Sequence, residues 1–247
     1  MSYLSFIKKE FKPNFKVVID DLRRSRDKDF FQPTGTTVYV GWQGSGKTLS
    51  AVKHVDDIMR RYPKAKLVTN LRFNHDLIDY ANRIHVFQTA DELAELLVGV
   101  NNGTYGVVYL IDEIHTYFNA LDSKNIPPYI FTEISQQRKQ RKCIVGTSQL
   151  WDRMAKPFRE QAMFEIQCST IMNVFTIQRV VDAHSLKMDR ETGRSVGKLI
   201  RRGWFFHNRR IRDLYDTYQK VISSQAQLDF ETSNPVIIGN VKKIKRR

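Results

Sequence analysis

The sequence of 247 residues has little of what a secreted or membrane-spanning protein contains. No stretch approaches the roughly 20 consecutive apolar residues that a transmembrane helix needs, so no integral membrane segment is expected. The first ten residues include Lys8 and Lys9 and no long apolar run, which argues against a signal peptide. Only two cysteines, Cys143 and Cys168, are present, and they lack metal-ligand spacing, which favours a reducing compartment.

Acidic residues are few beside the basic ones. Asp and Glu number 26 against 40 Lys and Arg, giving a formal net charge of +14 that suggests a polyanionic partner. Twelve basic residues lie in two stretches without any acid, residues 194–212 and 241–247, so the excess charge is concentrated at the C-terminal end. With 41% hydrophobic and 27% charged residues, the chain can form an α/β domain with a substantial core.

Short apolar runs alternate with stretches of helical periodicity from residue 36 onward. This alternation predicts βαβ units and therefore an α/β fold with a mainly parallel sheet. Residues 106–111 are almost wholly apolar, as expected of a central strand that is covered on both faces. The predicted strands are 36–40, 66–71, 83–87, 106–111 and 143–147, and the predicted helices are 48–62, 90–98 and 127–141.

These patterns divide the chain into three expected segments. Residues 1–34 form a polar N-terminal leader, in which Pro13 and Pro33 interrupt any helix. Residues 35–183 form the α/β domain, ending in a helix-free stretch that predicts an antiparallel hairpin. Residues 184–247 form a small, β-rich and basic C-terminal extension with a turn at 189–193, a helix near 212–223 and a disordered tail.

A glycine-rich sequence between the first predicted strand and helix carries the clearest chemistry. Residues 41–48 fit the phosphate-binding pattern G-x-x-x-x-G-K-[ST], whose glycines let backbone N–H groups converge on a phosphate at a helix N-terminus. Lys47 is expected to reach the β- and γ-phosphates of ATP, and the Thr48 hydroxyl to ligate Mg²⁺. The predicted nucleotide-binding residues are Gly41, Gln43, Gly44, Ser45, Gly46, Lys47, Thr48 and, from a later strand, Asp112.

A pair of carboxylates follows the most apolar predicted strand. Asp112 ends this run at the sheet edge where a nucleotide-bound metal would lie. Glu113 is the candidate catalytic residue, because a second carboxylate there can orient and deprotonate an attacking water; the alternative is a surface glutamate. Lys47 and Asp112 lie 65 residues apart, which leaves room for an additional central strand, as in the branch of P-loop ATPases that has a catalytic Glu.

Further catalytic candidates lie near the end of the next strand. Thr147 and Gln149 are candidates to sense the γ-phosphate or the lytic water, with a helix cap at Ser148 as the alternative. Arg138, within a basic cluster, is a candidate arginine finger for a neighbouring subunit's nucleotide, and Arg159 is a second choice. The alternatives for the basic cluster are a solvated face or a contact with phosphate backbone.

The basic window at 194–212 also contains aromatic residues, among them Trp204 and Phe206. Lys and Arg can neutralise phosphates while exposed aromatics stack on single-stranded bases. Alternatively, Trp204 and Phe206 are buried in a small core and the charges are solvated. Trp42, inside the glycine-rich loop, could stack on a base or simply be exposed. The basic tail would suit nucleic acid or an anionic membrane surface equally.

In their order and spacing, these motifs resemble the zonula-occludens-toxin-like assembly ATPases of filamentous phages, within the FtsK/HerA-type translocases. The resemblance covers about residues 37–183 and includes the glycine-rich loop, Val68–Leu71, Leu110–Glu113, Gln137–Lys139, Thr147–Gln149 and Arg159–Glu160. It implies an ATP-dependent, homo-oligomeric ring that handles viral DNA during virion morphogenesis. It also implies that Lys47 and Thr48 bind nucleotide and Mg²⁺, Asp112 holds the metal and Glu113 activates water.

The expected function is an ATP-hydrolysing motor that translocates or packages viral DNA, contacting the DNA backbone without sequence specificity. It would act in the cytoplasm, that of the host if the chain is viral, with a virion or portal protein as a further partner. Filamentous-phage members continue into a transmembrane helix and an outer domain, and the absence of both here favours packaging over membrane extrusion. The alternative is a membrane-associated nucleotide switch that acts on protein partners.

Overall fold

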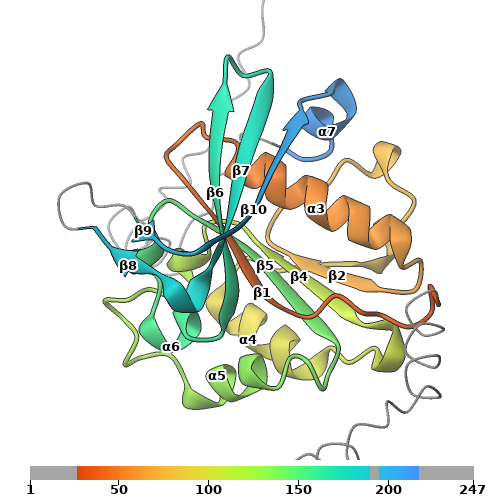
Figure 1. Ribbon diagram of the computed structural model, residues 1–247. Helices are drawn as coiled ribbons and strands as arrows, with labels where there is room; N and C mark the ends of the chain where they lie inside the picture. The colour runs from red at the N-terminus through yellow and green to blue at the C-terminus, as the bar shows by residue number, and fades with distance from the viewer. Residues whose placement is uncertain (1–26, 190–194, 217–247) are drawn as a thin grey trace, which may run out of the picture.

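The computed structural model describes residues 27–189 and 195–216. Within this part of the chain, eight strands form one sheet, in the spatial order β10-β7-β6-β1-β5-β4-β2-β3 (Figure 1). The strands from β6 to β3 run parallel to one another, whereas β7 pairs antiparallel with both β6 and β10. In chain order they are β1 (Gly35–Val40), β2 (Lys66–Thr69), β3 (Ile84–Val86), β4 (Val107–Ile111), β5 (Lys142–Ser148), β6 (Ala162–Ile171), β7 (Phe175–Asp182) and β10 (Leu199–Phe206). The predicted α/β fold with a mainly parallel sheet is confirmed.

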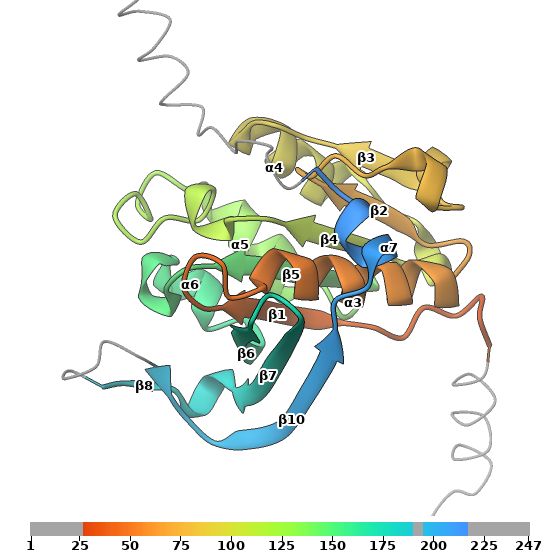
Figure 2. The same cartoon turned by 90° about the horizontal axis from the view of Figure 1, so that it is seen from above.

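Helices cover both faces of this sheet (Figures 1 and 2). One face is packed against α3 (Lys47–Arg61) and α7 (Arg209–Asp213), and the other against α4 (Ala90–Gly99), α5 (Pro128–Ser135) and α6 (Lys156–Arg159). Each face has its own hydrophobic core, so β4 and β5 are buried along their whole length. This double burial explains why the β4 sequence is continuously apolar instead of alternating.

Local sequence signals account for the helix ends. Helix α3 starts directly after the glycine-rich loop and carries Arg60 and Arg61 in its last turn, where cations interact favourably with the helix dipole. Helix α4 starts with a capping box, in which the Thr89 side chain accepts from the backbone N–H of Glu92 while the Glu92 carboxylate accepts from that of Thr89. Both helices begin and end within one residue of the expected positions.

Helix α5 is shorter than predicted, because it ends at Ser135 and the expectation of a helix to residue 141 is wrong. The segment that follows forms turns, and Arg141 adopts a left-handed backbone conformation with φ of 53°. Long-range contacts favour this conformation. The Gln137 side chain accepts a hydrogen bond from Thr36, and the Arg141 guanidinium donates to the Phe31 carbonyl and lies over the Phe30 ring.

The predicted antiparallel hairpin is present as β6 and β7, and it is continuous with the central sheet. Strand β6 pairs in parallel with β1, and β10 adds to the free side of β7. The sheet therefore runs across residue 183, so the division between an ATPase domain and a C-terminal extension stays a prediction. The end of the hairpin extends beyond the parallel strands, past the start of α3 (Figure 1).

Several predicted features lie outside the described residues: positions 1–26 of the leader, residues 190–194 of the turn, and residues 217–247 with the tail. The turn is flanked by an antiparallel pair, β8 (Lys187–Met188) and β9 (Ser195–Val196). Near the end of the predicted leader, Phe31 is fully buried against Tyr62. No helix in the described ranges has the length and apolar character needed to cross a membrane.

Candidate nucleotide-binding site

The glycine-rich loop connects the end of β1 to the first turn of α3. Gly46 caps the helix with φ of 82°, and a Cβ there would lie 2.5 Å from the hydroxyl oxygens of both Thr170 and Thr176. Only glycine fits this position, for reasons of backbone conformation and of space. Gln43 and Gly44 are exposed on the outside of the loop. The Ser45 hydroxyl is buried, with no hydrogen-bond partner among the described residues, so it is available to a ligand inside the loop.

The side chain of Lys47 is held inside the loop. It is buried, and its Nζ donates a hydrogen bond to the Trp42 carbonyl at 3.1 Å. The loop thus presents an ammonium group, a free hydroxyl and the N-terminus of a 15-residue helix to the same small volume. This combination of donors fits the phosphates of a nucleotide.

Asp112 lies at the centre of a hydrogen-bonded cluster beside the loop. Its Oδ1 accepts hydrogen bonds from the Thr48 hydroxyl at 2.8 Å and from the Thr147 hydroxyl at 2.7 Å. Burial raises the pKa of Asp112, and these two hydrogen bonds partly offset the effect. The Asn70 side chain fixes the Asp112 backbone by accepting from its N–H and donating to its carbonyl.

The donor set around Asp112 fits Mg²⁺. A carboxylate and a hydroxyl oxygen within hydrogen-bond distance of each other are hard ligands of the kind that Mg²⁺ uses, together with water and phosphate oxygens. The described residues contain no cluster of three or more His, Cys, Asp or Glu side chains that could hold a metal alone. A metal at Asp112 and Thr48 would therefore depend on the nucleotide for its remaining ligands.

Glu113 has a left-handed backbone, with φ of 48° and ψ of 51°. This conformation is costly for a residue with a Cβ, and it persists because the Glu113 N–H donates to Thr147 at 2.9 Å. Glu113 Oε2 is buried and lies 3.3 Å from His115 Nδ1 without forming a hydrogen bond. Burial, with Arg153 and Lys47, lowers the pKa of His115, so the imidazole is neutral near neutral pH. The site therefore contains a glutamate whose backbone is held by Thr147, beside a neutral imidazole.

Strand order explains why Thr147 reaches both carboxylate residues. Strand β5 lies between β1 and β4, so its C-terminal end is adjacent to the glycine-rich loop on one side and to Asp112 on the other. Strand β5 follows Asp112 in the sequence, whereas the 65 residues between Lys47 and Asp112, which were expected to leave room for an additional strand, contain β2 and β3. The Ser148 hydroxyl donates to the Leu150 carbonyl and caps no helix, whereas Gln149 lies outside the cluster and lines an adjacent pocket.

The two candidate arginine fingers lie away from this chain's own cluster. Arg138 is exposed in the turn before β5, at the sheet edge opposite the glycine-rich loop. The Arg159 guanidinium pairs with Asp152. Neither reaches Asp112 in the same chain, so a role for Arg138 on a neighbouring subunit stays a prediction. Sequence reasoning missed the contacts of Asn70, which lies within the predicted strand 66–71 but follows the observed β2, and of His115, which lies just after the predicted strand 106–111.

A glycine-rich phosphate loop, an Asp-Glu pair that follows a buried strand, and a strand inserted between β1 and β4 define the fold of a P-loop NTPase. The family model for zonular occludens toxin (Zot) matches residues 36–197, and the chain belongs to this family. The predicted family resemblance is therefore confirmed. No curated protein matches the chain in sequence.

Several solved structures are similar to this chain at low identity. The N-terminal domain of zonular occludens toxin from Neisseria meningitidis is 16% identical, with 75% of this chain and 100% of that chain covered and a TM-score of 0.49. The genome packaging NTPase B204 of Sulfolobus turreted icosahedral virus 2, in complex with ATP-gammaS, is 16% identical, with 62% and 94% covered and a TM-score of 0.46. The DNA-packaging ATPase B204 of Sulfolobus turreted icosahedral virus is 13% identical, with 62% and 94% covered and a TM-score of 0.49.

Proposed function

We propose that this protein is an ATP-hydrolysing motor that moves or packages viral DNA during virion assembly. The observation that carries the proposal is the arrangement of Thr147, which contacts both the metal-binding Asp112 and the backbone of Glu113. A nucleotide-binding switch needs the loop and the metal site. A hydrolase also needs a carboxylate held where a water can attack, and Glu113 meets that requirement.

Each residue of the cluster has a distinct role in the proposed reaction. Lys47 and the backbone of the loop bind the phosphates, and Ser45 offers an additional hydroxyl. Thr48 and Asp112 would hold Mg²⁺, which neutralises charge on the phosphates when it is bound. Glu113 accepts a proton from the attacking water. The imidazole of His115 is neutral and therefore places no positive charge beside that carboxylate. Thr147 positions Asp112 and Glu113 relative to each other.

The proposed DNA contact is a basic and aromatic stripe on one face of the outer strands. Arg202, Trp204 and Phe206 alternate along β10, and Arg179 is opposite Arg202 in the β7 register. Trp204 is 66% and Phe206 59% exposed, which argues against the alternative of a small buried core. Exposed arginines beside exposed aromatic rings suit backbone phosphates and unstacked bases. In this proposal residues 35–183 hydrolyse ATP, and residues 184–247, together with Arg179 of β7, contact DNA.

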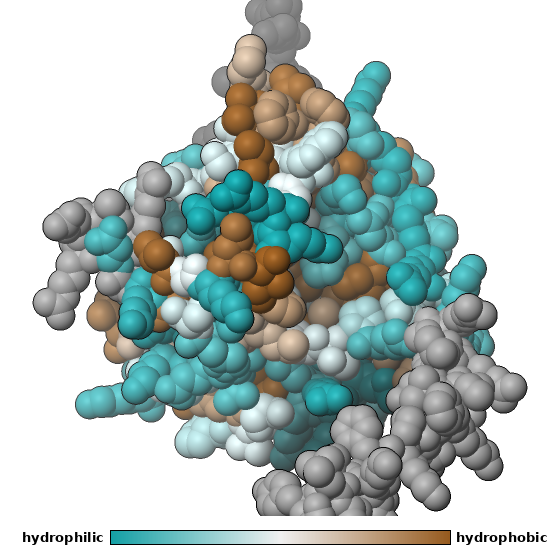
Figure 3. Space-filling model, in the orientation of Figure 1, coloured by the Kyte–Doolittle hydropathy of each residue, from teal (hydrophilic) through white to brown (hydrophobic). Residues whose placement is uncertain are grey.

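Assembly into a ring is part of the proposal. The end of the β6–β7 hairpin gathers exposed apolar side chains from Ile171, Met172 and Val174, and Figure 3 shows this apolar cap at the top of the molecule. Exposed apolar groups of this kind are common at interfaces between subunits. The ring would let Arg138 reach a neighbouring nucleotide and would present DNA to a virion or portal protein. Both cysteines are buried free thiols, which suits a cytoplasmic setting.

The test is the rate of phosphate release from Mg-ATP, with and without single- or double-stranded DNA. We expect DNA to stimulate the wild-type rate, Lys47→Ala to abolish it, and Glu113→Gln to lower it by about 10² to 10⁴-fold while ATP still binds. Glu160→Gln, the same chemical change at an exposed residue, is the matched control. Hydrolysis that survives Glu113→Gln, with retention on anionic liposomes instead of DNA, would replace the motor with the membrane-associated switch.

A further inference from the structure

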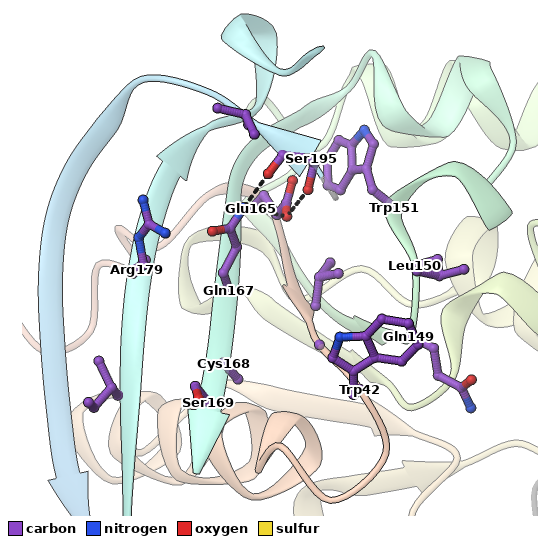
Figure 4. A pocket seen from close by; sticks show the side chains of 14 residues that line it. Trp42, Gln149, Leu150, Trp151, Glu165, Gln167, Cys168, Ser169, Arg179 and Ser195 are labelled. Carbon is purple, nitrogen blue, oxygen red and sulfur yellow. Dashed lines mark hydrogen bonds between the residues drawn. The ribbon is translucent and has the colours of Figure 1, made fainter. Parts of the chain in front are cut away.

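A pocket of about 310 Å³ opens beside the phosphate loop, on the sheet face opposite α3. Its floor is formed by side chains of β6 and β7, its far wall by the segment from Gln149 to Trp151, and its rim by Gly41 and Trp42 (Figure 4). The volume is in the range that suits a small organic ligand. The hydrolytic cluster at Asp112 uses none of the residues on the pocket floor.

One buried side-chain oxygen on the pocket floor lacks a hydrogen-bond partner among the described residues. Glu165 is fully buried, and its Oε1 accepts hydrogen bonds from the hydroxyl of Ser195 and from Gln167 Nε2. Glu165 Oε2 is also buried and has no hydrogen-bond partner within the described ranges. In Figure 4 Glu165 and Gln167 project from β6 on the side of the strand that carries the pocket. Such an oxygen is costly to leave unpaired, so the pocket offers one acceptor to a donor on its ligand.

The other walls favour a flat, aromatic ligand. The indole of Trp42 stands at the rim and is 63% exposed, while the buried Trp151 and the side chain of Ile177 line the interior. An indole with a free face is a surface on which a planar ring can stack. A planar ring that also donates one hydrogen bond corresponds to a nucleobase with an exocyclic amino group.

The position of Glu165 relative to the phosphate loop suits a nucleotide. In the register of β6 with β1, Glu165 is opposite Val38, two residues before the end of β1. It therefore lies about 7 Å below the last residue of β1, and the phosphate loop begins one residue further on. Because Gly41 and Trp42 belong both to the loop and to the rim, phosphates held by the loop and a base in the pocket can belong to one molecule.

We propose that this pocket binds an amino-bearing nucleobase, whose exocyclic amino group donates a hydrogen bond to Glu165 Oε2. The inference rests on the proposed function, because the adenine of the bound ATP is one source of the base. A base of single-stranded DNA is the other source, since Arg179 at the pocket edge continues into the basic and aromatic stripe on the same sheet face. Both sources can present the same exocyclic amino group to Glu165.

The first experiment compares the dissociation constants of ATP, ITP and tripolyphosphate in the Glu113→Gln background, which suppresses hydrolysis. ITP has a carbonyl in place of the amino group, so we expect wild-type Glu165 to favour ATP about tenfold or more. Glu165→Gln, whose amide can donate to that carbonyl, should bring the ratio near one. Glu160→Gln should leave it unchanged. Trp42→Ala, at an exposed position, should weaken ATP by about tenfold and leave tripolyphosphate unaffected.

The second experiment identifies a base that comes from DNA. Single-stranded oligomers of deoxyadenosine and deoxyinosine are titrated into the same variants, and a preference for deoxyadenosine that Glu165→Gln removes would assign the pocket to DNA. Equal affinities for amino and carbonyl bases in both experiments would overturn the proposal. If tripolyphosphate does not bind to the protein with wild-type Glu165 and Trp42, this result would instead contradict the proposed function, because tripolyphosphate requires only the phosphate loop.

Discussion

At the scale of single residues, the site depends on the conformation in which its residues are held as much as on their identity. Glu113 occupies a backbone conformation that favours glycine, and Thr147 stabilises it while also donating to Asp112. An aspartate and a glutamate that follow a buried strand are common in sequences. What distinguishes this pair is a hydroxyl on the neighbouring strand that fixes both, which makes Thr147 a positioning residue.

Replacing Thr147 with Val tests this role. The substitution nearly preserves shape but removes the donor to Asp112 and the acceptor for the Glu113 N–H, so we expect kcat to fall about tenfold or more while ATP affinity changes little. Steady-state hydrolysis and an independent ATP-binding titration measure the two effects. Thr132→Val, at an exposed position on α5, is the control. A parallel loss of binding would indicate that Thr147 maintains the loop and not the catalytic geometry.

The raised pKa of Glu165 predicts that the stability of the protein depends on pH. Burial raises its pKa above the ordinary value of 4.5, hydrogen bonds from Ser195 and Gln167 partly oppose this, and the charge of Asp152 adds to it. Because the folded state then binds more protons than the unfolded state above pH 4.5, Glu165 lowers stability as the pH rises toward neutral. Urea unfolding should therefore find Glu165→Gln gaining stability over wild type across this interval, with Glu160→Gln following wild type.

At the scale of elements, the arginines of the basic window are not equivalent. Arg202 lies exposed in the middle of β10, whereas Arg210 on α7 is bound to Asp56. Net charge counted along the sequence cannot separate these two environments. Only the exposed arginines are free to release counterions from DNA.

Arg202→Ala should weaken binding of DNA oligomers and reduce the slope of log K against log salt by about one unit. Fluorescence anisotropy over a series of salt concentrations measures both quantities. Arg61→Ala, which removes an exposed charge at the far end of α3, should leave the slope unchanged. Equal effects of the two substitutions would point to a diffuse charge effect and against a contact at β10.

The elements with the strongest local signals were predicted from sequence. The apolar run of β4, the glycine-rich loop and the helical periodicity of residues 90–98 each depend on neighbouring residues alone. The end of α5 could not be predicted, because good helix-forming residues there are held in turns by Thr36 and Phe31, more than 100 positions away. The pocket was missed for the same reason, because the sequence around Glu165 does not indicate that Ser195, 30 positions away, donates a hydrogen bond to it.

At the scale of the whole molecule, the C-terminal part of the described chain folds back onto the helix that follows the phosphate loop. Asp56 on α3 is buried and accepts hydrogen bonds from Arg60, Tyr80 and Arg210. Ile211 and Leu214 are buried beside it. The strand proposed to contact DNA is thus paired with β7 along its length, and α7, which follows it, is attached to α3.

Removal of the Arg210 contact should loosen this attachment. We expect Arg210→Ala to lower the free energy of unfolding by about 1–2 kcal/mol, because a buried carboxylate loses a charged donor that is itself 37% exposed. Arg209→Ala is the matched control. Arg209 is 95% exposed and, among the described residues, pairs only with Asp213 at 3.5 Å, so we expect its removal to change the free energy of unfolding by about zero. Chemical denaturation of both variants measures the difference, and equal losses would refute the attachment.

The crowding of Gly46 by Thr170 and Thr176 has a consequence for how the two proposed activities are coupled. Thr176 Oγ1 lies 2.7 Å from Thr170 Oγ1 and 2.7 Å from Nε2 of His207, the residue that follows β10. A line of hydrogen bonds therefore extends from the end of the proposed DNA strand to two threonines whose hydroxyls lie against Gly46 of the phosphate loop. If DNA changes the affinity for nucleotide by some factor, linkage requires the nucleotide to change the affinity for DNA by that same factor. The effect of nucleotide on DNA affinity and the effect of DNA on nucleotide affinity would then be two measurements of a single coupling free energy.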